Sequence, residues 1–126
     1  MLEREELTQC ELLVIKVIWE CEDALSIQEI AERVNRKFNR GWKIQTVSAF
    51  LGHIVHKGYL TMKRAGRRFY YYPQVTEEEY RTYEFTKSVN FWCEGRADKF
   101  LAAFAKDRSF TEEEKQHMKD IINDLD

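Results

Sequence analysis

The stretch YLTMKRAGRRFYYYP, from Tyr59 to Pro73, decides the fold that we predict for this chain of 126 residues. Its side chains alternate with a period of two on both sides of Ala65-Gly66, and such alternation around a turn glycine indicates a β-hairpin. Pro73 ends the second strand because proline cannot donate a ladder hydrogen bond. Four cations lie at or beside the tip, and the alternation means that they cannot all face the same way. They are Lys63, Arg64, Arg67 and Arg68.

Three helices are predicted before the hairpin. The first two begin with the S/T-x-x-E capping box, at Thr8–Glu11 and Ser26–Glu29, in which the hydroxyl and the carboxylate satisfy each other's backbone amides. Apolar residues then recur at helical spacing in residues 12–19 and 27–38, and a third such stripe runs through residues 43–55. The order helix, helix, helix, hairpin is that of a winged helix-turn-helix.

The rest of the chain is also predicted to be helical. The expected fold is therefore mainly α with a small β-hairpin, with a winged-helix domain in residues 1–73 and a helical domain in residues 74–126. Further capping boxes start at Thr76 and Thr111, and Gly95 separates two helices between them. These helices carry more apolar residues than they can bury alone, so we expect a homodimer. The expected dimer contacts are Phe85, Val89, Trp92, Phe100, Leu101, Phe104, Met118, Ile121, Ile122 and Leu125.

The formal net charge of −2 hides a strong segregation of charge along the chain. Residues 1–32 hold 2 Lys or Arg against 9 Asp or Glu, residues 33–76 hold 10 against none, and residues 77–126 hold 8 against 13. The acid-free window contains the third predicted helix and the hairpin, so both belong to one basic surface. Such a surface suits the phosphates of double-stranded DNA, and it also suits an acidic protein.

In a winged helix the third helix enters the DNA major groove and the hairpin lies along the backbone. With Val47, Leu51 and Ile54 on the core side, the outer face of this helix has no acid and mostly small side chains, which would let it sit deep in the groove. Gly52 is disfavoured within a helix by up to about 1 kcal/mol relative to alanine, and either close approach of a surface or helix packing would explain it. The candidate DNA contacts on this face are Gln45, Thr46, Ala49 and His53, and those on the hairpin are its four cations.

Catalysis, metal binding and cofactors find no support in the sequence. His53 and His56 are three residues apart, but no Cys, Asp or Glu near them completes a metal site, and the three cysteines lack metal-finger spacing. There is no Gly-rich phosphate loop and no nucleophile elbow. The chain has no run of about 18 apolar residues, and MLEREEL is not a signal peptide, so a cytoplasmic protein is expected.

The chain resembles the BlaI/MecI family of bacterial transcriptional repressors. The segments LTQCELLVIKVIWE, SIQEIAERVNRKF, GWKIQTVSAFLGHIVHKGYL and GRRFYYYP carry the resemblance in the family's order, and the tail through TEEEKQHMKDIIN is similar to its dimerisation region. The resemblance implies a homodimer that binds an inverted repeat over a promoter, with a membrane sensor-protease as a further candidate partner. It also implies that the third helix meets bases and phosphates through Lys43, Gln45, Thr46 and Ser48, and that Arg67 and Arg68 serve the wing.

The sequence departs from the family pattern in ways that bear on regulation. The antibiotic-resistance repressors are cut at an Asn-Phe bond on induction, and Ala103-Phe104 stands at the matching position here, so induction by proteolysis and induction by a ligand both stay open. Lys43-Ile44 replaces the usual Ser-Pro after Trp42, which predicts a different helix cap and operator preference. A related copper-responsive branch of the family carries paired Cys-x-Cys motifs near its C-terminus. No cysteine follows Cys93 in this sequence, so copper sensing is not expected. The alternative function is a winged helix that binds an acidic protein and does not select a DNA sequence.

Overall fold

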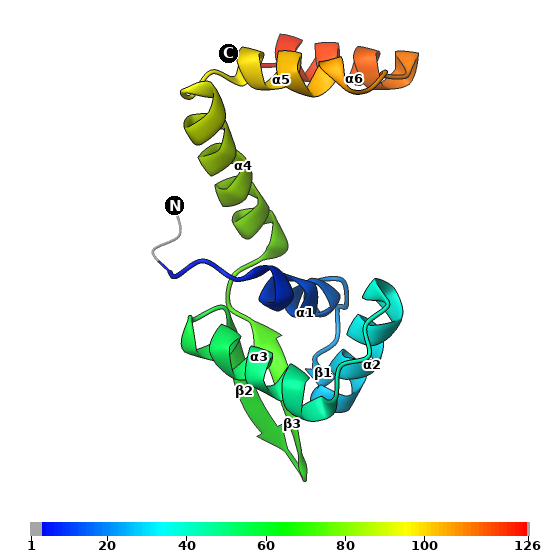
Figure 1. The fold of residues 1–126 in the computed structure, drawn as a ribbon, viewed down its shortest axis with the longest axis vertical. Helices are drawn as coiled ribbons and strands as arrows, with labels where there is room; N and C mark the ends of the chain where they lie inside the picture. The colour runs from blue at the N-terminus through cyan, green and yellow to red at the C-terminus, as the bar shows by residue number, and fades with distance from the viewer. Residues whose placement is uncertain (1–3, 126) are drawn as a thin grey trace. The chain divides into compact units, whose positions relative to one another are not determined.

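A computed structural model describes residues 4–125 of the protein (Figure 1). The chain divides into two compact units, residues 1–83 and 84–126, and the division falls inside helix α4 (Glu77–Cys93). Residues 1–3 and 126, the outer ends of the two expected domains, lie outside the described residues.

The first unit is a winged helix-turn-helix, as the sequence predicts. Three antiparallel strands form a sheet in the order β1-β3-β2, and in Figure 1 the tip of the β2–β3 hairpin extends beyond α3. The elements in chain order are α1 (Gln9–Trp19), β1 (Leu25–Ser26), α2 (Ile27–Phe38), α3 (Ile44–His56), β2 (Leu60–Ala65), β3 (Arg68–Pro73) and the start of α4.

The predicted helix starts are confirmed by their hydrogen bonds. Thr8, Ser26 and Thr111 each accept the amide three residues on, while the glutamate at that position accepts the amide of the cap residue. Thr76 and Glu79 make the same reciprocal pair at the start of α4, with both distances 3.1 Å. Local pairs of residues therefore fix where four of the helices begin.

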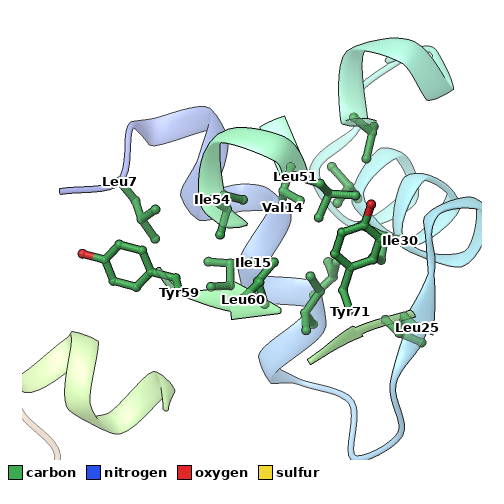
Figure 2. Close-up of a cluster of buried hydrophobic side chains, with 14 of the residues drawn as sticks. Leu7, Val14, Ile15, Leu25, Ile30, Leu51, Ile54, Tyr59, Leu60 and Tyr71 are labelled. Carbon is green, nitrogen blue, oxygen red and sulfur yellow. The ribbon is translucent and has the colours of Figure 1, made fainter. Parts of the chain in front are cut away.

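Side chains from all three helices and the sheet meet in one hydrophobic core (Figure 2). Buried residues of α3 recur at Val47, Leu51 and Ile54, which turns one face of this helix inward and leaves the opposite face to solvent. The other large fully buried members are Val14, Ile15, Ile18, Leu25, Ile30, Val34, Tyr59, Leu60 and Val75. Core packing therefore determines which face of α3 is exposed.

The predicted hairpin is present, but its turn lies one residue later than expected. Ala65 pairs with Arg68, so the two turn residues are Gly66 and Arg67 rather than Ala65 and Gly66. Gly66 takes a φ of 67°, which suits the first central position of a two-residue hairpin turn. The sequence does not predict β1, because a strand of two residues is too short to show a period. In this strand Ser26 pairs with Tyr70, and the same residue caps α2.

The second unit contains the rest of α4, then α5 (Ala97–Lys106) and α6 (Glu112–Asn123), as predicted. Glu94 and Gly95 take φ values of 52° and 81° and separate α4 from α5. Within residues 4–125, no helix is both long and apolar enough to cross a lipid bilayer.

Candidate nucleic-acid interface

The outer face of α3 places most of its predicted contact residues in solvent. Thr46 is an exception, since its side chain is half-buried beside the core. Lys43 is the exposed N-cap residue, and no side chain of the described residues caps this helix. The exposed members of the face are Gln45, Ser48, Ala49, Gly52 and His53. The chain thus presents a row of short or uncharged side chains with a cation at the start of the helix.

The register of the hairpin sorts its cations between two faces. Lys63 pairs with Tyr70 and Arg68 with Ala65, so these two cations share one face. Arg64 lies on the opposite face, and Arg67 stands in the turn. The expectation that the four cations cannot all face one way is therefore confirmed.

Aromatic rings and a backbone carbonyl hold two of these cations in place. The Lys63 ammonium lies 5.1 Å from the centre of the Tyr72 ring, and the Arg64 guanidinium lies 6.0 Å from that of Phe69. Arg64 Nε also donates to the Gly66 carbonyl at 2.9 Å. The wing aromatics therefore make weak cation–π contacts with two of the four cations.

Ion pairing distinguishes the wing from three other cations of the acid-free window. Arg36 pairs with Glu32, Lys37 with Glu20, and Lys57 with Glu11. None of the four wing cations pairs with a carboxylate among residues 4–125. The four wing cations share this lack of a carboxylate partner with Arg33, Arg40 and Lys43, but the wing gathers the largest number of them in one short segment.

The start of α3 is tied to α2 by one side chain. The Asn35 amide donates to the Trp42 carbonyl at 2.9 Å and accepts the Trp42 amide at 3.0 Å. The Trp42 ring lies 5.0 Å from Phe50 and carries the Arg40 guanidinium 5.9 Å above its centre. This cluster fixes the turn between α2 and α3, and through it the direction in which α3 starts.

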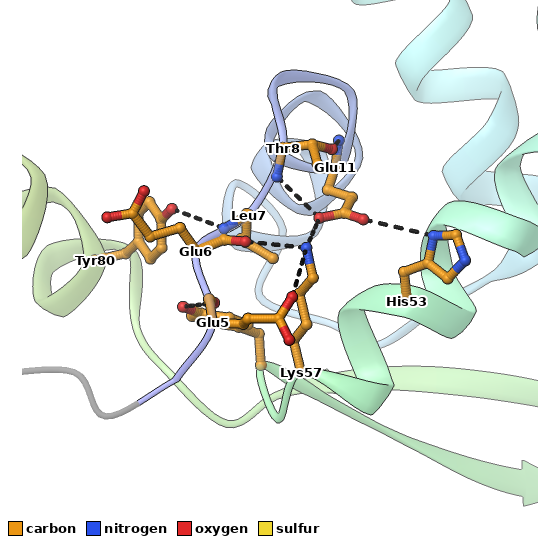
Figure 3. A network of polar contacts seen from close by, with 9 residues as sticks. Glu5, Glu6, Leu7, Thr8, Glu11, His53, Lys57 and Tyr80 are labelled. Atoms are coloured by element: carbon orange, nitrogen blue, oxygen red, sulfur yellow. Dashed lines mark hydrogen bonds and ion pairs between the residues drawn. The ribbon is translucent and has the colours of Figure 1, made fainter.

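The end of α3 is tied to α1 by a buried carboxylate (Figure 3). Glu11 is only 3% exposed and accepts from Lys57 Nζ at 2.7 Å, while its Oε2 lies 3.6 Å from His53 Nδ1. Burial raises the pKa of Glu11, but hydrogen bonds from Lys57 and Thr8 outweigh it and hold that pKa below its ordinary value. Glu11 therefore stays charged, and the His53 side chain that lies beside it is 66% exposed on the predicted contact face.

The chain before α1 joins the end of α3 to the start of α4. The Tyr59 hydroxyl donates to the Glu5 carbonyl at 2.7 Å, and the Leu7 amide donates to the Tyr80 hydroxyl at 3.2 Å (Figure 3). Burial raises the pKa of Tyr59 to about 12, so this phenol remains a donor at neutral pH. Sequence reasoning missed these contacts because the partners lie far apart along the chain.

The second unit exposes the apolar residues that the sequence assigned to a dimer contact. Val89 and Met118 are half-buried, and the remaining eight are exposed. Phe91, which the sequence analysis missed, is 73% exposed and lies 4.7 Å from the ring of Trp92. Ala103-Phe104, the possible cleavage position, lies within helix α5. An open groove on this unit is lined mainly by apolar side chains of α5 and α6, including Leu101, Met118 and Ile122.

Nothing in the described part of the chain resembles a metal centre. No three His, Cys, Asp or Glu side chains of residues 4–125 come together in a way that could hold a metal ion. The three cysteines are free thiols, with Cys93 buried and Cys10 and Cys21 half-buried.

Comparison with known proteins agrees with this architecture. The sequence model of the penicillinase repressor family matches residues 7–124. The chain is 23% identical over 119 residues to the penicillinase repressor of Bacillus licheniformis, covering 94% of this chain and 91% of the relative. It is 22% identical over 118 residues to the methicillin resistance regulatory protein MecI of Mammaliicoccus sciuri, covering 94% of each.

Solved structures point the same way. The solution structure of the DNA-binding domain of the repressor BlaI matches with a TM-score of 0.53 and 28% identity, covering 64% of this chain and 94% of that domain. The Bacillus licheniformis BlaI monomeric form in complex with the blaP half-operator matches with the same values. The resemblance seen in the sequence is confirmed: with nearly its whole length matched, the chain belongs to the penicillinase repressor family, a family of DNA-binding repressors and not of enzymes.

Proposed function

We propose that this protein is a dimeric transcriptional repressor that binds a pseudo-palindromic operator in a promoter. The observation that carries the proposal is the wing, whose cations form no ion pair among the described residues, beside the exposed and acid-free face of α3. Phosphates that neutralise such cations release counterions, which supplies much of the affinity of a DNA-binding protein. The relatives support the same function, since they are repressors and one solved relative is bound to a half-operator.

In the proposed complex α3 enters the major groove. Its Gln45 amide is suited to adenine and the Ala49 methyl to a thymine methyl, with Ser48 and His53 on the same face. Lys43 and the half-buried Thr46 lie near the start of the helix, where a phosphate at the rim of the groove is the nearer target. Base contacts would select the sequence, while the phosphate contacts would set the position of the helix.

The wing serves the DNA backbone in this proposal. Lys63 and Arg68 share one face of the hairpin and Arg67 stands at its tip, so these three reach successive phosphates. Arg64 faces the other way and bonds its own turn, so we assign it to shaping the tip together with a weaker phosphate contact.

We further propose that residues 1–73 bind DNA and residues 74–126 form the dimer. The exposed apolar residues of α4, α5 and α6 support this, because monomeric proteins rarely leave so much apolar surface in water. Two-fold symmetry would set two α3 helices in successive major grooves, about 34–36 Å apart. A repressor acts where the chromosome lies, so the proposed location is the cytoplasm.

A membrane sensor-protease enters the proposal only as the partner that the family resemblance implies. The Ala103-Phe104 bond lies within α5, and a protease acts on locally unfolded chain, so cleavage there requires α5 to unwind first. Induction by a ligand is the second route, and the groove between α5 and α6 is where we would look for it.

Fluorescence anisotropy tests the proposed function. The probes are a duplex from upstream of the protein's own gene, duplexes selected from random DNA by the wild-type protein, and a scrambled duplex. We expect selective binding that weakens with salt. Arg67→Ala/Arg68→Ala should lower the slope of log affinity against log salt by about 2, because about two phosphate contacts are lost.

Arg36→Ala/Lys37→Ala is the matched control for this experiment. It removes the same formal charge from the acid-free window, but both of its side chains already pair with carboxylates of the chain. We expect a clearly smaller change of slope than in the wing variant. Equal, weak binding of the wild type to the selected and scrambled duplexes would overturn the repressor and leave the acidic-protein partner as the better function.

A further inference from the structure

One glycine in α3 has no explanation within the chain. The chain has five glycines, and Gly58, Gly66 and Gly95 take positive φ values that favour glycine. Gly41 lies outside any helix, in the turn before α3. Gly52 lies inside α3 with no positive φ, and a Cβ built on it would meet no atom of the described residues within 4 Å.

The open space around Gly52 decides between the two explanations that the sequence left. Packing of α3 against another helix of the chain would place atoms where the missing Cβ would be, and none of the described residues does so, which rules out packing among those residues. Alanine would fit this position and would favour the helix by about 0.5–1 kcal/mol. The protein thus carries a destabilising residue whose benefit lies outside the folded chain.

The position of Gly52 indicates what approaches it. It follows Gln45 by seven residues and Ser48 by four, so these three residues lie along one face of α3. All three are exposed, and Gly52 is followed directly by the exposed His53. A groove that receives Gln45 and Ser48 therefore continues past Gly52, where the helix is at its narrowest.

We propose that Gly52 is the position at which the backbone of α3 itself touches DNA, and that it admits no side chain in the complex. This inference rests on the proposed function. It adds that Gly52 determines how deeply α3 sits in the major groove. A methyl group at position 52 would hold the helix away from the groove floor. Contacts from Gln45 and Ser48 would then lengthen, although neither residue is changed.

The inference predicts opposite effects of one substitution on stability and on binding. Gly52→Ala should raise the urea concentration at the midpoint of unfolding, since alanine is the better helix former. The same variant should bind the selected duplex about tenfold or more weakly, which is the size of losing one good base contact. Binding to the scrambled duplex should hardly change, because it depends on phosphates more than on fit in the groove.

A second variant separates steric exclusion from helix flexibility. Gly52→Ala/His56→Gly keeps one glycine in α3 but moves it by one turn, to an exposed residue outside the proposed contacts. If the methyl group itself blocks DNA, the double variant still binds weakly; if α3 needs only a flexible position, binding is restored and the inference is overturned.

The remaining outcomes are also decisive. Wild-type affinity for the selected duplex in Gly52→Ala would overturn the inference while leaving the repressor function intact. Failure of the wild-type protein to prefer any duplex would overturn the proposed function, and this inference with it. Circular dichroism of each full-length variant confirms that it is folded before its binding is measured.

Discussion

Lys57, at the end of the helix proposed to read DNA, donates a hydrogen bond of 2.7 Å to the buried carboxylate of Glu11 in the first helix. Both side chains are largely shielded, since Lys57 is 12% and Glu11 3% exposed. Without Glu11, Lys57 would keep only the Glu5 carboxylate at 3.9 Å and the Glu6 carbonyl at 3.0 Å among the described residues, so its largely shielded charge would be poorly compensated.

We therefore expect Glu11→Ala to destabilise the protein strongly. The loss should be about 3 kcal/mol, because a largely shielded ammonium loses its nearest carboxylate and α1 loses half of its capping box. Urea denaturation of the full chain measures it. Glu32→Ala is the control, since Glu32 and Arg36 form an exposed pair on α2 whose removal should change stability by less than about 1 kcal/mol. Equal losses in both variants would contradict the structural importance of the Glu11 pair.

The same carboxylate predicts how stability depends on pH. The folded-state pKa of Glu11 lies below its ordinary value of 4.5, since the hydrogen bonds from Lys57 and Thr8 outweigh burial. A depressed folded pKa contributes stability that is present above the unfolded pKa and is lost as pH falls through the folded pKa. The difference in unfolding free energy between wild type and Glu11→Gln should therefore be constant near neutrality and shrink below about pH 4.5. A difference that stays constant down to pH 3 would contradict the charged pair.

The Asn35 clamp, which is the pair of hydrogen bonds between the Asn35 side chain and the Trp42 backbone at the start of α3, should affect both protein stability and DNA binding. Asn35→Ala removes the two hydrogen bonds to the Trp42 backbone, and we expect a loss of about 2 kcal/mol in stability. Because this clamp sets the direction of α3, affinity for the selected duplex should fall as well, even under conditions where the variant is fully folded. Fluorescence anisotropy measures the affinity for the selected duplex, and urea denaturation measures the loss of stability. An unchanged affinity would show that core packing alone directs the helix.

Dimerisation should depend on the exposed aromatic pair of α4. Trp92→Arg places a charge where the side chain is 75% exposed in the single chain and would be buried by a second copy. We expect a monomer by sedimentation velocity, with the winged helix still folded. His117→Arg adds a similar charge at an exposed polar residue of α6 and should remain dimeric. A wild-type protein that sediments as a monomer at tens of micromolar would refute the proposed dimer.

Much of the fold could be predicted because its signals are local. A threonine or serine with a glutamate three residues later marks a helix start wherever it occurs, and the pairs at Thr8, Ser26, Thr76 and Thr111 are all confirmed. The period of two predicts the hairpin, but the period alone does not locate a two-residue turn, so the predicted turn lies one residue before the observed one.

The sequence predicts the charge of the candidate site, but it does not predict the contacts that hold α3 in position. The basic window follows from counting residues, and the outer face of α3 follows from its apolar spacing. The contact between Glu11 and Lys57 joins residues 46 apart, and no local pattern announces it. The open space around Gly52 likewise cannot be predicted from the sequence, because a sequence shows a glycine but not the atoms near it. The individual DNA and dimer contacts stay predictions until binding is measured.

The surroundings of the three tryptophans make the unlabelled protein its own optical probe. The Trp19 indole donates a hydrogen bond to the Val75 carbonyl. Trp42 lies just before the start of α3, in contact with Phe50, and Trp92 is exposed to solvent. Emission from Trp92 should shift to shorter wavelength when a second chain covers it, whereas emission from Trp42 should be quenched when nucleobases approach. With Trp19 as a steady internal reference, one emission spectrum would follow assembly and operator occupancy separately during a single titration.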